Sequence, residues 1–123
     1  MPYDALRHDG DTNRLILTFH GTGGTAGQFH GAAQAMVPGA HVVSPNGDVL
    51  EGGAQRFFRR KAEGVYDMED LATRTAAMTE FVLAERERTG AEHVTGLGYS
   101  NGANILASVA FQRPELFDAL VLM

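Results

Sequence analysis

Short apolar runs alternate with longer helix-like segments along this chain, and this alternation restricts its fold more than any other feature. Four runs have the length and composition of buried strands, and the segments between them have helical spacing. The predicted strands are 14–19 (RLILTF), 41–45 (HVVSP), 93–99 (HVTGLGY) and 117–123 (FDALVLM), and the predicted helices are 28–37, 67–89 and 101–112. Because strands that alternate with helices pair in parallel, the sequence predicts an α/β fold, a parallel sheet with helices on both faces.

The segment 67–89 carries the clearest helical pattern. Its apolar positions recur at steps of three and four, Asp67 is a candidate N-cap, and Gly90 is placed to end the helix. The segment 47–64 shows no period and is predicted to be a long loop. Loops of that length in compact domains are usually functional. No repeat or linker divides the chain, so we expect one domain over residues 1–123.

The composition excludes several kinds of function. The chain has 123 residues, a formal net charge of −5 and no cysteine. The absence of cysteine rules out a disulfide, a thiolate zinc site and a cysteine nucleophile within these residues. The acidic balance argues against nucleic acid as a partner. The five histidines show no metal-ligand spacing, so we expect no metal and no cofactor.

The apolar runs are too short to cross a bilayer, and residues 1–14 contain no apolar stretch of signal-peptide type. From these two observations the sequence predicts a cytoplasmic protein with no membrane partner.

The stretch GLGYSNGAN, residues 96–104, carries the most specific chemical signal. It reads G-x-S-x-G around Ser100, with a strand before it and a helix after it. A sharp strand-to-helix turn of this kind projects a serine hydroxyl toward substrate, and Gly98 and Gly102 remove side chains where strand and helix approach. Asn101 begins the helix, so its N–H can point at an oxyanion. The simpler alternative is a glycine-rich turn that binds nothing or a phosphate.

The stretch HGTGG, residues 20–24, stands where a second oxyanion donor is needed, directly after the first strand. The N–H of Thr22 is the candidate donor. The glycines Gly21, Gly23 and Gly24 would let the backbone approach the acyl group of the substrate. Tyr99, directly before the nucleophile, is a further candidate substrate-binding residue. We expect His20 to shape this loop, because it precedes the nucleophile in chain order.

Dinucleotide binding is a rival interpretation of the same loop. GTGGTA, residues 21–26, fits G-x-G-x-x-G/A after a strand. That fingerprint also needs an acidic residue at the end of the next strand, about 20 residues on. The next strand ends in Ser44-Pro45 and Asp48 lies beyond the turn, so the fingerprint is incomplete.

The two motifs together resemble the α/β-hydrolase superfamily, and more narrowly the small bacterial carboxylesterases of the phospholipase/carboxylesterase branch, relatives of acyl-protein thioesterases. The matching stretches are LTFHGTGGT, VVSPNGDVLEGGAQRFFRRKAEGVYDMEDL and GLGYSNGANILAS. The resemblance implies hydrolysis of a small carboxylic or thio ester without a metal, with Ser100 as nucleophile and Thr22 and Asn101 as oxyanion donors. It also places Arg56, Phe57 and Phe58 on the loop beside the acyl pocket.

One departure from the family pattern concerns the base. In this fold the acid and the histidine follow the nucleophile in chain order. After Ser100 the chain has two carboxylates, Glu115 and Asp118, and no histidine. By resemblance, the chain is the N-terminal part of a hydrolase domain, from the oxyanion loop through the strand after the nucleophile helix. We therefore expect these residues alone to be nearly inactive.

Two further expectations follow. The strand ALVLM, 119–123, is apolar enough to pair with a missing C-terminal portion of the domain or with itself. The basic-aromatic cluster RFFRRK, 56–61, could contact nucleic acid or an anionic substrate group, but on an acidic chain packing and pocket lining are favoured. A non-catalytic binding module of the same fold remains an alternative to an enzyme.

Overall fold

The computed structural model describes residues 3–62 and 65–123 and is built on one five-stranded sheet. The strand order is β1-β3-β2-β8-β9, and β3, β2, β8 and β9 run parallel, as predicted. One strand outside the predicted set, β1, extends the sheet at one edge, where it pairs antiparallel with β3. The strands are β1 (Ala5–His8), β2 (Arg14–Phe19), β3 (His41–Pro45), β8 (His93–Gly98) and β9 (Ala119–Leu122).

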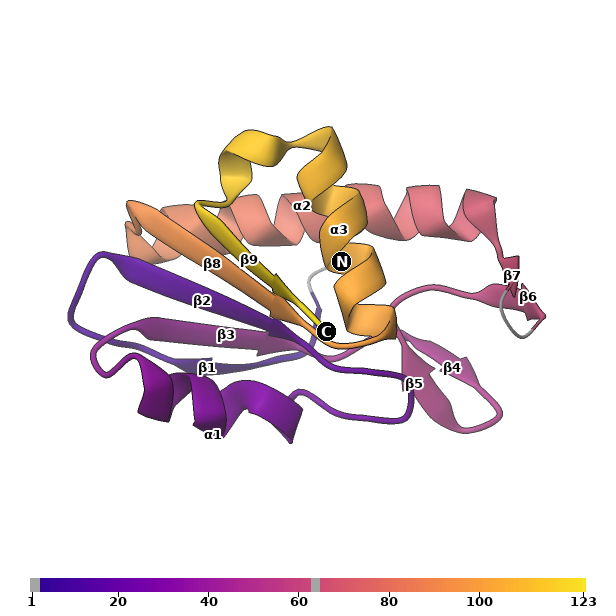
Figure 1. The fold of residues 1–123 in the computed structure, drawn as a ribbon, viewed down its shortest axis with the longest axis horizontal. Helices are drawn as coiled ribbons and strands as arrows, with labels where there is room; N and C mark the ends of the chain where they lie inside the picture. Colours follow the sequence, from indigo (N-terminus) through magenta and orange to yellow (C-terminus); the bar gives the residue numbers. More distant parts are fainter. Residues whose placement is uncertain (1–2, 63–64) are drawn as a thin grey trace.

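Helices cover both faces of this sheet (Figure 1), which confirms the predicted layering. On one face lies α1 (Gly27–Met36), and on the other lie α2 (Met68–Thr89) and α3 (Asn101–Gln112). A short 3-10 turn, η1 (Pro114–Leu116), leads from α3 to β9.

The alternation of side chains along β2 divides the core between the two faces. Leu15, Leu17 and Phe19 are fully buried in the larger cluster, with residues of α2 and α3. Ile16 belongs to the smaller cluster on the α1 face, together with Ala33. Since successive strand residues point to opposite faces, β2 is buried on both sides, as expected of a central parallel strand.

The ends of α2 match the sequence prediction. Asp67 is the N-cap, and its Oδ1 accepts a hydrogen bond of 3.1 Å from the N–H of Asp70. Gly90 ends the helix in the left-handed conformation, with φ of 67°, which glycine adopts without a steric cost.

The segment 47–64 is more ordered than predicted, with residues 63 and 64 outside the described part of the chain. It forms two short hairpins near the carboxyl ends of the parallel strands (Figure 1). The strands of the segment are β4 (Val49–Glu51) and β5 (Ala54–Arg56), which pair with each other, and β6 (Arg60–Ala62), which pairs with β7 (Val65–Tyr66) just after the segment. Strands of two or three residues carry no readable period, and these are held by contacts to distant residues such as the Gly23 N–H bond to the Gln55 carbonyl, 3.0 Å.

The edge strand β9 exposes apolar side chains, among them Val121 at 44% and Leu122 at 49%. Among the described residues it pairs with β8 alone. No helix within the described residues is long and apolar enough to cross a membrane.

Candidate active site

Ser100 stands on a strained turn between β8 and α3. Its φ of 54° and ψ of −116° make it the one non-glycine residue with positive φ in the described part of the chain. A Cβ at Gly102 would lie 2.1 Å from the Phe19 carbonyl oxygen, and a Cβ at Gly98 would lie 2.8 Å from the Ala103 Cα. The turn therefore needs both glycines and holds the serine in a conformation that costs about 1–3 kcal/mol.

Backbone hydrogen bonds fix the turn to the sheet on both sides. The N–H of Tyr99 donates to the Phe19 carbonyl at 3.1 Å, and the N–H of Ser100 donates to the Met123 carbonyl at 2.8 Å. The Ser100 side chain is exposed at the carboxyl ends of β2 and β8. This is the edge where parallel α/β sheets place their ligand sites.

His20 holds the glycine-rich loop and is buried, with 2% of its surface exposed. Its Nε2 accepts a hydrogen bond of 2.9 Å from the Gly47 N–H. Its Nδ1, which must then carry the proton, donates to the Gly21 carbonyl at 2.7 Å. Burial lowers the pKa of His20, although the bond to Gly21 opposes that shift. A neutral histidine with both ring nitrogens engaged fits the loop-shaping role expected for it.

The glycines of the loop meet the nucleophile turn closely. A Cβ at Gly21 would lie 2.7 Å from the Tyr99 ring, and one at Gly24 would lie 2.6 Å from the Gln28 side-chain oxygen. That oxygen also accepts a hydrogen bond from the Gly21 N–H at 3.0 Å. Gly23 has φ of 79°. The loop is therefore shaped by residues that leave Thr22 at its tip, exposed to solvent.

The two motifs meet at a pocket of about 300 Å³. Its lining consists of Thr22, Arg56, Arg60, Tyr66, Ser100, Asn101 and Asn104. The backbone N–H groups of Thr22 and Asn101 have no hydrogen-bond acceptor among the described residues. Unpaired backbone N–H groups at the same pocket as a serine hydroxyl are what an oxyanion hole requires.

The stretch RFFRR, residues 56–60, was expected beside the acyl pocket, but some of its side chains line this pocket and others lie in the hydrophobic core. Arg56 lines the pocket. Phe57 and Phe58 are fully buried in the main hydrophobic cluster and do not line it. Packing holds them there, since the Phe57 ring lies 5.8 Å from the Phe19 ring and 4.6 Å from the His20 ring, centroid to centroid.

No histidine or carboxylate lines the pocket among the described residues. His30, a histidine upstream of the nucleophile, is buried on α1 with its Nδ1 2.7 Å from the Ser44 hydroxyl. Asp118 precedes β9, and its carboxylate accepts from the Val94 N–H at 2.8 Å. Val94 is near the start of β8, so Asp118 lies at the opposite end of the sheet from Ser100.

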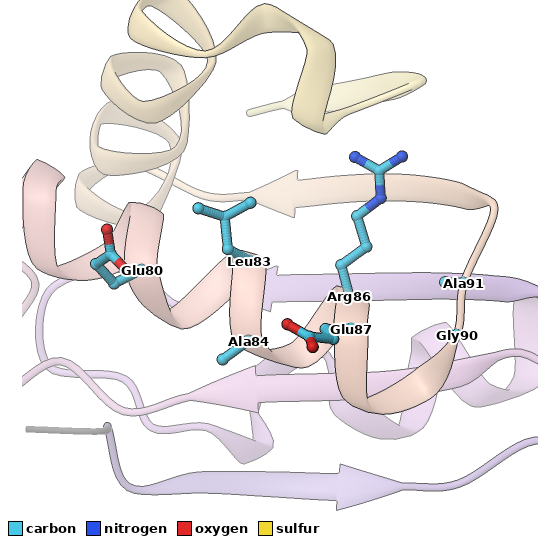
Figure 2. Close-up of a pocket in the computed structure, with 7 residues that line it drawn as sticks. All are labelled: Glu80, Leu83, Ala84, Arg86, Glu87, Gly90 and Ala91. Atoms are coloured by element: carbon cyan, nitrogen blue, oxygen red, sulfur yellow. The ribbon is translucent and has the colours of Figure 1, made fainter.

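A larger hollow of about 730 Å³ lies along the second half of α2 and the turn that follows it (Figure 2). Its lining includes Glu80, Leu83, Arg86 and Glu87. The described residues that line it include no serine, no histidine and no residue of the two motifs, so they offer no nucleophile.

Dinucleotide binding would need an acidic side chain at the end of β3 to bind the ribose. Ser44 is fully buried at the end of β3. Asp48 pairs with Arg74 at 2.9 Å. The ribose contact that the fingerprint requires therefore has no candidate at the end of β3.

Two pocket residues, Tyr66 and Asn104, were not predicted from the sequence, whereas Arg60 belongs to the cluster 56–61 for which pocket lining was expected. Asn104 lies one turn after Asn101 on α3, a spacing that could have identified it. Arg60 and Tyr66 belong to the hairpin β6–β7, whose position no local pattern reveals.

No family model matches the chain. Among curated proteins, it is 37% identical over 115 residues to MhqD of Bacillus subtilis (strain 168), which is named a hydrolase, covering 92% of this chain and 58% of that protein. Among solved structures, it is similar to Atu2452 of Agrobacterium tumefaciens, a protein of unknown function, at 50% identity and a TM-score of 0.92, covering 96% of this chain and 58% of the other. It is also similar to the Bacillus cereus carboxylesterase, at 36% identity and a TM-score of 0.89, covering 98% and 58%. The chain thus spans 58% of the length of each of these relatives.

Proposed function

We propose a function for this chain from the premise that it belongs to the α/β-hydrolase superfamily and resembles its carboxylesterases. It carries the nucleophile and the oxyanion hole of a serine hydrolase that acts on small carboxylic or thio esters. The observation that carries this proposal is the convergence of Ser100, in its strained turn, with two unpaired backbone N–H groups at one pocket.

The reaction proceeds through an acyl-enzyme. The Ser100 Oγ attacks the ester carbonyl, and the N–H groups of Thr22 and Asn101 stabilise the negative charge on the carbonyl oxygen. The C–O or C–S bond to the leaving group breaks, and the proton from the serine passes through a base to that leaving group. Water then attacks the acyl-serine and releases the acid.

No residue that could serve as this base is found among the described residues that line the pocket. In a serine hydrolase, loss of the base costs on the order of 10⁶ in rate, with a small remainder from the oxyanion hole and binding. We therefore propose that a histidine and an acid from outside these 123 residues complete the site, and that these residues alone turn over ester very slowly.

Covalent labelling tests the nucleophile separately from turnover. The chain is incubated with a small fluorophosphonate in a high concentration of imidazole, which supplies a base from solution, and the modified residue is located by peptide mass. We expect a single adduct on Ser100 and none in Ser100→Ala.

An adduct elsewhere, or an unmodified chain after prolonged incubation with imidazole, would refute the proposal. An unmodified chain would favour a non-catalytic binding module of the same fold, which needs no base at the pocket.

A further inference from the structure

The pocket beside Ser100 is lined by cations and hydrogen-bond donors. Arg56 and Arg60 contribute guanidinium groups, and no Asp or Glu lies among its described lining residues. On a chain with a formal net charge of −5, this is a local reversal of sign. The two arginines are not equivalent, and their difference indicates what the pocket binds.

Arg56 is engaged by the protein itself. Its side chain is buried, with Nε 3.0 Å from the Phe58 carbonyl oxygen and Nη1 2.6 Å from the Thr22 hydroxyl. Glu51 Oε1 lies 2.9 Å from Nε, an ion pair without hydrogen-bond geometry. The charge of Arg56 is therefore balanced, and its geometry holds Thr22 in place.

Arg60 differs in both respects. It is exposed on β6, and no carboxylate of the described residues forms an ion pair with it. The two guanidinium groups line the same pocket, and burial, followed by the nearby charge of Arg60, lowers the pKa of Arg56. One positive charge at the pocket thus remains uncompensated by the described residues.

Asn101 supplies an independent sign of a ligand. Its side chain is 3% exposed, and its Oδ1 accepts a hydrogen bond of 2.7 Å from the Phe57 N–H, which fixes the orientation of the amide. Its Nδ2 is buried without a partner among the described residues, although Asn101 lines the pocket. A buried donor left unpaired is costly unless a ligand accepts from it.

Tyr66 adds a further donor. Its hydroxyl oxygen accepts from the Asn104 Nδ2 at 2.7 Å, which leaves the hydroxyl proton free to donate. Within residues 3–62 and 65–123, the pocket therefore combines a cation without an ion-pair partner, an unpaired amide donor and a phenol donor, next to the serine.

We propose that this pocket recognises a carboxylate on the substrate, so that the preferred esters are half-esters of short dicarboxylic acids. Arg60 pairs with the free carboxylate, and the ester carbonyl lies at Ser100. A single unbalanced positive charge matches a carboxylate better than a phosphate monoester, whose charge is close to −2. The volume of about 300 Å³ is at the small end for ligand sites and suits a short chain.

This inference rests on the proposed function, since Ser100 defines the reacting end, but binding tests it without turnover. The probes are monomethyl succinate, which carries one carboxylate, and neutral dimethyl succinate. Their dissociation constants are measured by NMR titration of the amide signals of residues 100–104, with the chain and with Ser100→Ala. We expect the half-ester to bind about tenfold more tightly than the diester in both proteins, as one charge-assisted hydrogen bond predicts.

Two arginine variants separate recognition from general charge. Arg60→Gln should remove the preference for the half-ester, and Arg60→Lys should retain most of it. Arg59→Gln removes the same charge from the adjacent residue, which lies beside Asp67 and Asp70 in a different hollow, and should leave the preference unchanged.

Three results would overturn the inference: equal binding of the two esters, equal loss in Arg59→Gln and Arg60→Gln, or tighter binding of inorganic phosphate than of monomethyl succinate. None of these outcomes concerns the nucleophile. A failure of Ser100 to label with fluorophosphonate would refute the proposed function while the binding preference stood, so the two failures are distinguishable.

Discussion

The backbone of α3 approaches the end of β2 closely at Gly102, so a methyl group added at this residue should destabilise the fold. In Gly102→Ala, the new Cβ would lie 2.1 Å from the Phe19 carbonyl oxygen and 2.4 Å from the His20 carbonyl oxygen. Both atoms belong to the backbone and cannot rotate away, so α3 and the end of β2 must separate.

The magnitude follows from two opposing terms. Alanine is favoured over glycine within a helix by up to about 1 kcal/mol. Overpacking typically costs about 1–3 kcal/mol, and more where the neighbour is rigid. We expect Gly102→Ala to lower the free energy of unfolding by about 2 kcal/mol.

Gly31→Ala is the matched control, because Gly31 is also helical but a Cβ added there would meet no atom within 4 Å. It should gain about 0.5–1 kcal/mol. Urea unfolding of both variants, followed by far-UV circular dichroism, measures the difference. Equal midpoints for the two variants would refute the close approach of α3 to β2 on which the site depends.

Three further predictions concern strain, pH and association. Ser100→Gly should raise the free energy of unfolding by about 1 kcal/mol, because glycine adopts a φ of 54° without strain. Ser100→Ala should not raise it, and equal urea midpoints for the two variants would argue against strain at this residue. Burial lowers the pKa of His20 below the unfolded value of about 6.5, so the stability that the neutral side chain contributes is full above that pH and is lost as the pH falls through the folded pKa. His20→Gln should therefore lower the free energy of unfolding at pH 7 and flatten its decline between pH 7 and 5. An unchanged slope of stability against pH would contradict this. The chain should self-associate through the edge strand β9, as measured by sizing chromatography with light scattering. Val121→Lys should reduce this association, whereas Phe111→Lys, which changes an apolar side chain that is 89% exposed on α3, should not. A stable dilute monomer would contradict association through β9.

Local patterns predicted most of the sheet and the nucleophile turn. The run 14–19 is apolar at nearly every buried position, and the caps of α2 are encoded by Asp67 and Gly90. The G-x-S-x-G spacing predicted a turn that needs its flanking glycines, and the structure shows the backbone atoms that their side chains would meet.

Features held by long-range contacts could not be predicted in this way. The strand β1 is four residues long and pairs with β3, more than thirty residues away, so its antiparallel direction has no local signal. The hairpin that brings Arg60 and Tyr66 to the pocket is similarly placed by tertiary contacts. The aromatic character of Phe57 and Phe58 does not tell pocket lining from core packing. Burial decides their place, with Phe57 against Phe19 and His20 and Phe58 against Tyr66.

Ester hydrolysis with an added base tests the central claim, that Ser100 is a nucleophile whose base these residues lack. Release of p-nitrophenol from p-nitrophenyl acetate is measured for the chain and for Ser100→Ala, with and without imidazole. Without imidazole the two rates should be nearly equal, and with imidazole the chain should exceed Ser100→Ala by a margin that grows with imidazole concentration. Rapid turnover without imidazole that Ser100→Ala abolishes, or equal rates at every imidazole concentration, would contradict the account.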